Sequence, residues 1–219
     1  PNKLLLTTPG IDTQTGDYEE FGIPATILAS FLRDNRIIPE KNDFNSILFL
    51  MTPAETKMKL DSLVAQLMRF EQLVEQNAPV SQVMPYLYWD NEERYRGVGI
   101  RELCQEMHDF YKERNAKKFQ RALFREEFFP EVAMSPYDAG IALVKNHAKL
   151  LDGALPYPPG IFCVVPGERW SEPAIEYFRI LEEGINRFPG FAPEIHGVYL
   201  NKKEDRTKIY AYVYCEEQK

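Results

Sequence analysis

The chain has 219 residues, of which 44% are hydrophobic and 27% charged, and its formal net charge is −7. This length suffices for one large domain or two small ones, each with a buried core. The acidic balance argues against nucleic acid or an anionic membrane surface as the main partner, and it is compatible with small cationic substrates. No apolar run reaches transmembrane length, and residues 1–20 lack the pattern of a secretory signal. Three cysteines far apart do not suggest a disulfide framework, so a cytoplasmic location is expected.

The beginning of the chain alternates strand and helix patterns. Residues 4–8 form an apolar run closed by Pro-Gly, which predicts a buried strand. Pro24 suits the first turn of a helix that continues to about residue 35 with one apolar face. Residues 37–38 and 47–50 are apolar and flank an Asn-Asp turn, so two further short strands are expected there.

A helix start signal follows these strands. The sequence Thr-Pro-Ala-Glu at 52–55 combines a capping box with proline at the first helical position. The apolar residues after it recur at close to a 3.6-residue period, and the helix is expected to end before Pro79. These apolar positions are Leu60, Leu63, Leu67, Phe70 and Val74. Residues 1–78 are therefore predicted to form a small α/β domain.

The remainder, residues 79–219, is predicted to be a mixed α+β domain. Residues 80–98 are rich in aromatic side chains and show no clear period, so no regular element is expected there. Helices are expected over 100–114, 116–125, 135–150 and 172–187, a strand over 161–165, and a hairpin of 195–200 with 207–215.

Prolines and glycines constrain the segment 155–168, which is otherwise apolar. Tyr157 lies in the rigid part of this segment, where the backbone can hold one aromatic hydroxyl at a defined point. The alternative is a tyrosine that merely packs under a proline-rich turn, and the residues alone do not decide between the two readings.

Glu40 lies between two apolar runs and directly follows Pro39. A carboxylate held there in a partly apolar pocket could bind a cationic group through a charge-assisted hydrogen bond. The alternative is a surface carboxylate, or one that pairs with Lys41. The three histidines, His108, His147 and His196, are isolated and lack metal-ligand spacing, so no metal site is expected.

Several segments resemble, in the same order, the bacterial fold-type I ornithine/lysine/arginine decarboxylases. They are residues 4–10 (LLLTTPG), 21–24 (FGIP), 37–50, 103–109 (LCQEMHD), 155–161 (LPYPPGI) and 188–191 (FPGF). The resemblance covers nearly the whole chain and identifies it as the C-terminal part of such an enzyme. It implies the small α/β domain over residues 1–78, the C-terminal α+β domain over 79–219, and upstream wing and cofactor-binding domains that this chain does not contain.

The resemblance also implies a function for the parent enzyme. Family members are lyases that use pyridoxal phosphate to decarboxylate basic amino acids. Residues 44–56 are more similar to the branch that converts L-ornithine to putrescine and CO₂ in polyamine metabolism. Glu40 aligns with the glutamate that meets the distal amine of the substrate, and Tyr157 aligns with a residue of the substrate pocket. Family members form homodimers or larger homo-oligomers.

The cofactor itself is not expected to bind this chain alone. In the family the pyridoxal phosphate lysine follows a histidine in a Ser-x-His-Lys motif, which does not occur here. The chain alone is therefore predicted to be inactive, with no catalytic residue in this portion. Family members also have a longer connection where this chain has residues 150–155, which suggests either a short connection or residues missing near 151–153.

Two other readings remain open at this stage. Lysine decarboxylase is the nearest, because lysine differs from ornithine by a single methylene, a difference that a pocket discriminates weakly. Arginine is disfavoured, since arginine-specific members lack a glutamate at the position of Glu40. The second reading, from a different class, is a non-catalytic assembly module that holds subunits together through the aromatic and helical stretch 80–130.

Overall fold

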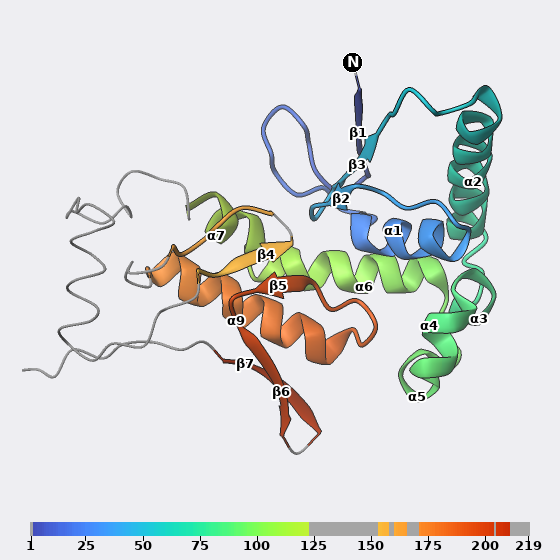
Figure 1. The fold of residues 1–219 in the computed structure, drawn as a ribbon. Coiled ribbons are helices and arrows are strands. Elements are labelled where there is room, and N and C mark those ends of the chain that lie inside the picture. The colour runs from blue at the N-terminus through green and yellow to red at the C-terminus, as the bar shows by residue number, and fades with distance from the viewer. Residues whose placement is uncertain (1, 123–152, 158–159, 166–170, 204, 211–219) are drawn as a thin grey trace, which may run out of the picture. The chain divides into compact units, whose positions relative to one another are not determined.

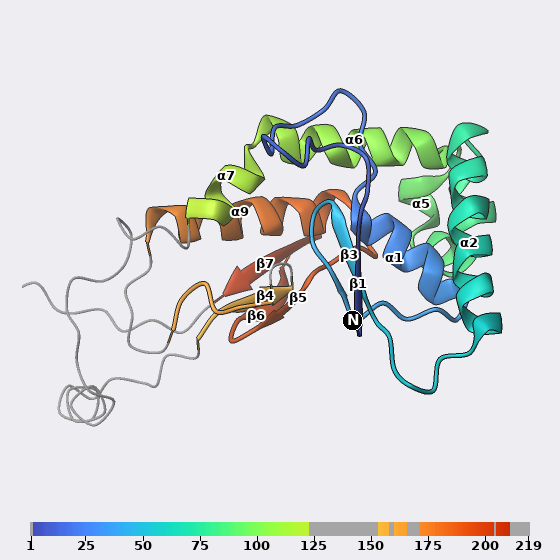
Figure 2. The ribbon, with the colours of Figure 1, turned by 90° about the horizontal axis from the view of Figure 1, so that it is seen from above.

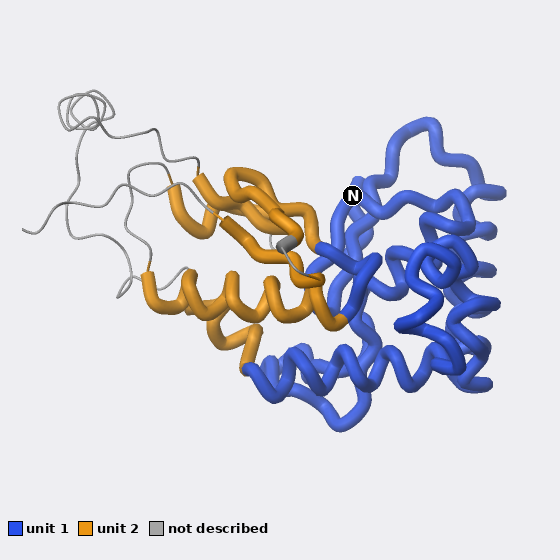
Figure 3. The backbone as a smooth tube through the Cα atoms, turned by 90° about the horizontal axis from the view of Figure 1, so that it is seen from below, with its two compact units in different colours: residues 1–114, 188–192 blue, residues 115–187, 193–219 orange. Residues whose placement is uncertain are grey.

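The computed structural model describes residues 2–122, 153–157, 160–165, 171–203 and 205–210 (Figure 1). The chain divides into two compact units. Unit 1 comprises residues 1–114 and 188–192, and unit 2 comprises residues 115–187 and 193–219 (Figure 3). Both units combine helices with small antiparallel sheets, which confirms the mixed α/β and α+β fold class. Across the described residues, no helix combines the length and apolar character that crossing a bilayer requires.

The sheet of unit 1 has three antiparallel strands in the order β1-β3-β2 (Figure 1). They are β1 (Lys3–Thr7), β2 (Lys41–Asn42) and β3 (Ser46–Leu50). The prediction of a buried first strand is wrong, because β1 is an edge strand that pairs with β3, and the side chain of Leu5 is 62% exposed. The strand predicted at residues 37–38 is also absent, and the pairing with β3 begins later, at β2.

Of the first two helices of unit 1, one packs beside this sheet and the other packs against the first helix. The first, α1 (Ala25–Asp34), confirms the prediction made from Pro24, which stands at its N-cap. The second, α2 (Lys57–Glu75), begins later than predicted, with Thr56 as the N-cap. The capping box predicted at residues 52–55 does not begin the helix. These residues form a turn instead, in which Glu55 N donates to Thr52 O at 3.0 Å. The rings of Phe31 and Phe70 meet at 5.1 Å where α1 contacts α2.

The stretch after α2 is helical rather than irregular. It contains α3 (Val80–Val83), α4 (Pro85–Asp90) and α5 (Glu92–Tyr95). Each of these helices is shorter than two turns, so the sequence offers no repeat from which a helical period could be recognised. The long helix α6 (Ile100–Glu113) follows, as predicted, and contributes a buried face to the core of unit 1. The buried apolar residues of this face are Ile100, Leu103, Cys104, Met107 and Phe110.

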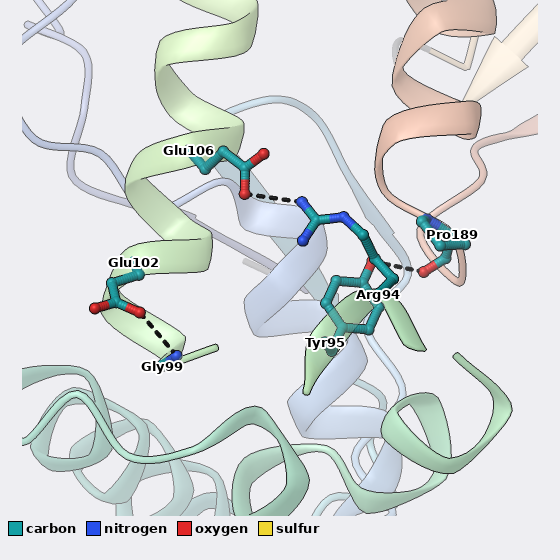
Figure 4. Close-up of polar contacts among 6 residues, drawn as sticks. All are labelled: Arg94, Tyr95, Gly99, Glu102, Glu106 and Pro189. Atoms are coloured by element: carbon teal, nitrogen blue, oxygen red, sulfur yellow. Dashed lines mark hydrogen bonds and ion pairs between the residues drawn. The ribbon is translucent and has the colours of Figure 1, made fainter. Parts of the chain in front are cut away.

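A short return segment, Phe188–Ala192, completes unit 1. The Tyr95 hydroxyl donates a hydrogen bond of 2.7 Å to the carbonyl oxygen of Pro189 (Figure 4). The ring of Phe188 meets that of Phe110 edge to face at 5.4 Å. Arg94 forms an ion pair with Glu106 at 2.8 Å and lies over the Tyr95 ring (Figure 4). These contacts fasten residues distant in sequence to α5 and α6.

Unit 2 contains α7 (Ala116–Ala122), α9 (Glu172–Arg187) and two separate two-stranded sheets (Figure 2). Both helices agree with prediction within the described residues. The hairpin of β6 (Tyr199–Lys203) and β7 (Arg206–Tyr210) is fastened to α9, because Ile209 N donates to the Glu182 carboxylate at 2.8 Å. A hairpin was therefore correctly expected, although its first strand starts at residue 199 rather than 195.

The other sheet pairs β4 (Leu155–Tyr157) with β5 (Glu194–His196). The strand predicted over residues 161–165 is wrong, since only Val164 forms a bridge there, with Ala154. Pro156 lies within β4, where it is buried opposite Ile195. The predicted helix over 135–150 lies outside the described residues, and of the connection at 150–155, where residues near 151–153 were suggested to be missing, only residues 153–155 are described.

Candidate functional site

Glu40 lies in unit 1 immediately before β2, at the edge of the three-stranded sheet. Its backbone amide donates to Leu48 O at 2.8 Å, so the start of β2 is fixed against β3. Pro39 is buried beneath it and the Glu40 side chain is exposed. Within the described residues its carboxylate forms no ion pair or side-chain hydrogen bond, and in particular none with Lys41. The arrangement presents a carboxylate on a fixed backbone, available to a cationic group.

The neighbour of Glu40 on this surface is Ile38, whose side chain is 81% exposed. Exposure alternates along this segment, with Ile38 and Glu40 exposed on either side of the buried Pro39. An exposed apolar side chain two positions from an exposed carboxylate suits a ligand with an alkyl stem and an ammonium end.

Tyr157 lies in unit 2 at the end of β4 and is 37% exposed. Gly160, at φ +78°, folds its backbone against the ring, where an added Cβ would lie 2.8 Å from Tyr157 Cε1. Gly160 N also donates to Pro156 O at 2.7 Å, which closes the turn. The expectation that the Pro/Gly segment restrains this tyrosine thus agrees with the geometry around the ring.

The sequence analysis missed two residues that contact this tyrosine or lie beside it. The rings of Tyr157 and His196 meet edge to face, 5.9 Å apart at 75°. Glu194 pairs with Tyr157 across β4 and β5, and its carboxylate lies 2.9 Å from His196 Nε2. Their separation of nearly forty residues in sequence conceals this proximity, and the signal that could have revealed it is the alternation of residues 194–196 as a short strand.

Glu40 and Tyr157 belong to different units, so neither unit by itself brings the two predicted site residues together.

Two other candidate residues occupy structural positions in unit 1. Arg101 lies over the ring of Phe21, with its guanidinium carbon 4.2 Å from the ring centroid. His108 is buried, and its Nε2 lies 3.0 Å from the carbonyl oxygen of Glu19. Both arrangements fix the loop that precedes α1 onto α6.

The residues present do not fit a covalent pyridoxal phosphate site. No lysine in the described ranges with assigned burial is buried, and no histidine of the chain directly precedes a lysine. Among the described residues there is also no group of three or more His, Cys, Asp or Glu side chains that could hold a metal ion. Cys104 and Cys163 are free thiols.

Models of two domains of one protein family match parts of this chain. The family model for the major domain of Orn/Lys/Arg decarboxylases matches residues 1–59, and that for their C-terminal domain matches residues 117–215. An inducible ornithine decarboxylase from Lactobacillus sp. (strain 30a) is 58% identical over 99% of this chain and 31% of its own length. An ornithine decarboxylase from Haemophilus influenzae is 56% identical over 97% of the chain and 31% of its own length.

Among solved structures, lysine decarboxylase A from Pseudomonas aeruginosa superposes with a TM-score of 0.84 at 32% identity, covering 98% of the chain and 30% of that structure. The chain thus spans about a third of the length of the curated relatives it matches. Sequence and fold agree in placing it within one family. The chain belongs to the Orn/Lys/Arg decarboxylase family and corresponds to the C-terminal part of its ornithine decarboxylases.

Proposed function

We propose that the protein containing this chain is a cytoplasmic, homo-oligomeric, pyridoxal phosphate-dependent lyase that converts L-ornithine to putrescine and CO₂. In this proposal residues 1–78 are its small α/β domain and residues 79–219 its C-terminal domain. The greater similarity to ornithine decarboxylases than to the lysine enzyme supports the choice of substrate. The free thiols of Cys104 and Cys163 are consistent with a reducing compartment.

The observation that carries the proposal is the unpaired carboxylate of Glu40 on a fixed backbone. L-ornithine has an ammonium group at the far end of a three-carbon chain, and this carboxylate would bind it. A charge-assisted hydrogen bond of this kind fixes the substrate along its length and so presents its α-carbon to the reacting centre. Pyridoxal phosphate, held by the upstream domain, supplies the electron sink for loss of the carboxylate.

Tyr157 contributes the wall of the pocket in this proposal. Its ring is restrained by the Gly160 turn, so its hydroxyl has a defined position. Exposed apolar side chains follow it in the chain, namely Ile161, Phe162 and Val165, each close to half exposed. Such a surface suits contact with another part of the enzyme, as expected if Tyr157 completes a pocket built from several domains.

The deciding experiment compares the full-length enzyme with its Glu40→Gln variant on L-ornithine, L-lysine and L-norvaline. Norvaline has the carbon skeleton of ornithine but lacks the distal amine. Losing the charged partner should lower kcat/KM for ornithine by about ten- to a hundredfold. Norvaline decarboxylation should be unaffected by the variant. Glu71→Gln, the same change at an exposed position on α2, serves as the matched control.

Each alternative predicts a different result. Higher kcat/KM for lysine than for ornithine in the wild-type enzyme would identify a lysine decarboxylase that uses the same carboxylate. Equal effects of Glu40→Gln and Glu71→Gln would show that Glu40 does not bind the distal amine. If the full-length protein loaded with pyridoxal phosphate decarboxylated none of the basic amino acids, the assembly-module reading would replace the proposal.

A further inference from the structure

The face of the β4–β5 sheet that carries Tyr157 has a defined composition. The antiparallel register pairs Leu155 with His196 and Tyr157 with Glu194. Directly paired residues lie on the same face, so these four side chains share one face of the sheet. Pro156, which alternates with them, is buried on the opposite face. The exposed face therefore places an imidazole and a carboxylate around the tyrosine.

Within this face, the carboxylate of Glu194 contacts the imidazole of His196, and the imidazole contacts the ring of Tyr157. The Glu194 carboxylate lies 2.9 Å from His196 Nε2, which sets the orientation of the imidazole ring. The imidazole in turn meets the Tyr157 ring edge to face, at a centroid distance of 5.9 Å. Edge-to-face contact is a favoured geometry for two aromatic rings and restricts rotation of both.

Gly160 supplies the second restraint on the same ring. Its backbone lies so close to Cε1 and Cδ1 of Tyr157 that a side chain at this position would have to displace the ring. The positive φ of Gly160 is also unfavourable for other residues. A tyrosine that is more than a third exposed would ordinarily sample several rotamers, yet this one has contacts from both the turn and the neighbouring strand.

We propose that His196, oriented by Glu194, is a positioning residue that holds the Tyr157 ring in the conformation used to bind substrate. This inference rests on the proposed function, in which Tyr157 walls the ornithine pocket. His196 acts through Tyr157 and has no contact of its own with the substrate. The sequence gives no local indication of this role, because it arises from the pairing of two short strands.

The test is a double-mutant cycle in the full-length enzyme, with Tyr157→Ala, His196→Ala and the combination of both. Loss of the edge-to-face contact should lower kcat/KM for L-ornithine by about threefold to tenfold. His196→Ala should have no further effect when Tyr157 is already absent. His196→Phe keeps an aromatic edge and should restore most of the activity. Glu194→Ala should produce a smaller loss in the same direction, and Lys208→Ala, an exposed truncation on β7, should produce none.

Two results would overturn the proposal. One is an undiminished effect of His196→Ala in the Tyr157→Ala background, which would show that the histidine acts elsewhere. The other is a crystal structure of full-length His196→Ala with the Tyr157 ring unmoved against Gly160. That structure also separates this inference from the proposed function. If Tyr157→Ala leaves the kinetics unchanged, the pocket assignment of Tyr157 fails, whereas displacement of the ring in His196→Ala still supports the positioning contact.

Discussion

The backbone of Gly22 lies directly against the imidazole of His108, so that an added Cβ would overlap Nδ1 of that ring. The two residues come from the loop before α1 and from α6, which are separated by most of unit 1 in sequence. Because His108 Nε2 also contacts Glu19 O, the ring cannot move away without losing a buried polar contact. Glycine is thus required at position 22 by space.

Gly22→Ala is expected to destabilise the protein by about 2 kcal/mol, because the added methyl group overpacks a buried site. Urea unfolding followed by circular dichroism gives the change in free energy. Gly97→Ala is the matched control, since Gly97 has φ +77° but no heavy atom within 4 Å of an added Cβ. It should show only the conformational penalty of about 1 kcal/mol. Unchanged stability in Gly22→Ala would contradict the packing described.

The N-terminus of α6 is capped from outside its own helix by Asn77. The Asn77 side-chain oxygen accepts the amide hydrogens of Arg101 at 3.0 Å and Glu102 at 3.3 Å. Asn77→Ala should lower stability by about 1 kcal/mol for the lost cap, and by about 1 kcal/mol more because Asn77 has φ 47°.

Two further substitutions at Asn77 separate these effects. Asn77→Asp keeps the acceptor and places a negative charge at a helix N-terminus, so it should be close to wild type. Asn77→Gly removes the cap but tolerates the backbone conformation, so its stability should lie between the stabilities of the Asp and Ala variants. Thermal unfolding ranks the three variants, and a rank order with Asp least stable would exclude the capping role.

The hydrogen bond from the buried Tyr95 side chain to the half-buried Pro189 carbonyl provides a third test. Tyr95→Phe leaves the ring in place but removes the donor from this carbonyl oxygen, which should cost about 1 kcal/mol. This loss of stability is measured as the change in the free energy of unfolding. Tyr86→Phe removes a hydroxyl from a side chain that is 72% exposed and should be neutral. If both variants were neutral, water would have to reach the Pro189 carbonyl.

Alkaline pH should destabilise unit 1 through the buried thiol of Cys104. Burial raises the pKa of this thiol to about 12 from an ordinary value of 9.0. Between these values the unfolded chain releases the thiol proton and the folded chain retains it, so stability falls as the pH rises, by about 1.4 kcal/mol per pH unit. Below pH 9 the thiol contributes no pH dependence.

Cys104→Ala should make this alkaline slope shallower, whatever its effect on stability at neutral pH. Urea midpoints measured at intervals from pH 8 to pH 10.5 give the slope. Val83→Ala, which also truncates a buried side chain of unit 1 but carries no titratable group, should shift all midpoints and leave the slope unchanged. A wild-type slope in Cys104→Ala would show that folding does not raise the pKa of this thiol, contrary to the burial described.

Long amphipathic patterns were sufficient to predict α1, α6 and α9 from the sequence, because each presents several turns of one apolar face. Short elements could not be predicted in this way, because α3 to α5 and β4 are fixed by contacts with residues far along the chain. The apolar run of β1 was mistaken for a buried strand because sequence alone does not show which strands lie at a sheet edge.

The candidate site, like the fold, could be predicted from the sequence only in part. Glu40 and Tyr157 were chosen from local sequence and family resemblance, and the structure accounts for the restraint on each backbone. His196 looks isolated in the sequence because its relation to Tyr157 depends on strand register, which no local pattern encodes. Whether the two predicted residues share one pocket remains a prediction for the full-length enzyme.

The chain crosses between its two units three times, after residues 114, 187 and 192. The two units are therefore interleaved, and no single truncation point yields both of them intact. A fragment ending at residue 114 would lack the Pro189 carbonyl that receives the Tyr95 hydroxyl and the Phe188 ring that packs on Phe110. A family boundary drawn near residue 117 marks the first crossing only, and a recombinant fragment designed on that boundary would have an incomplete core.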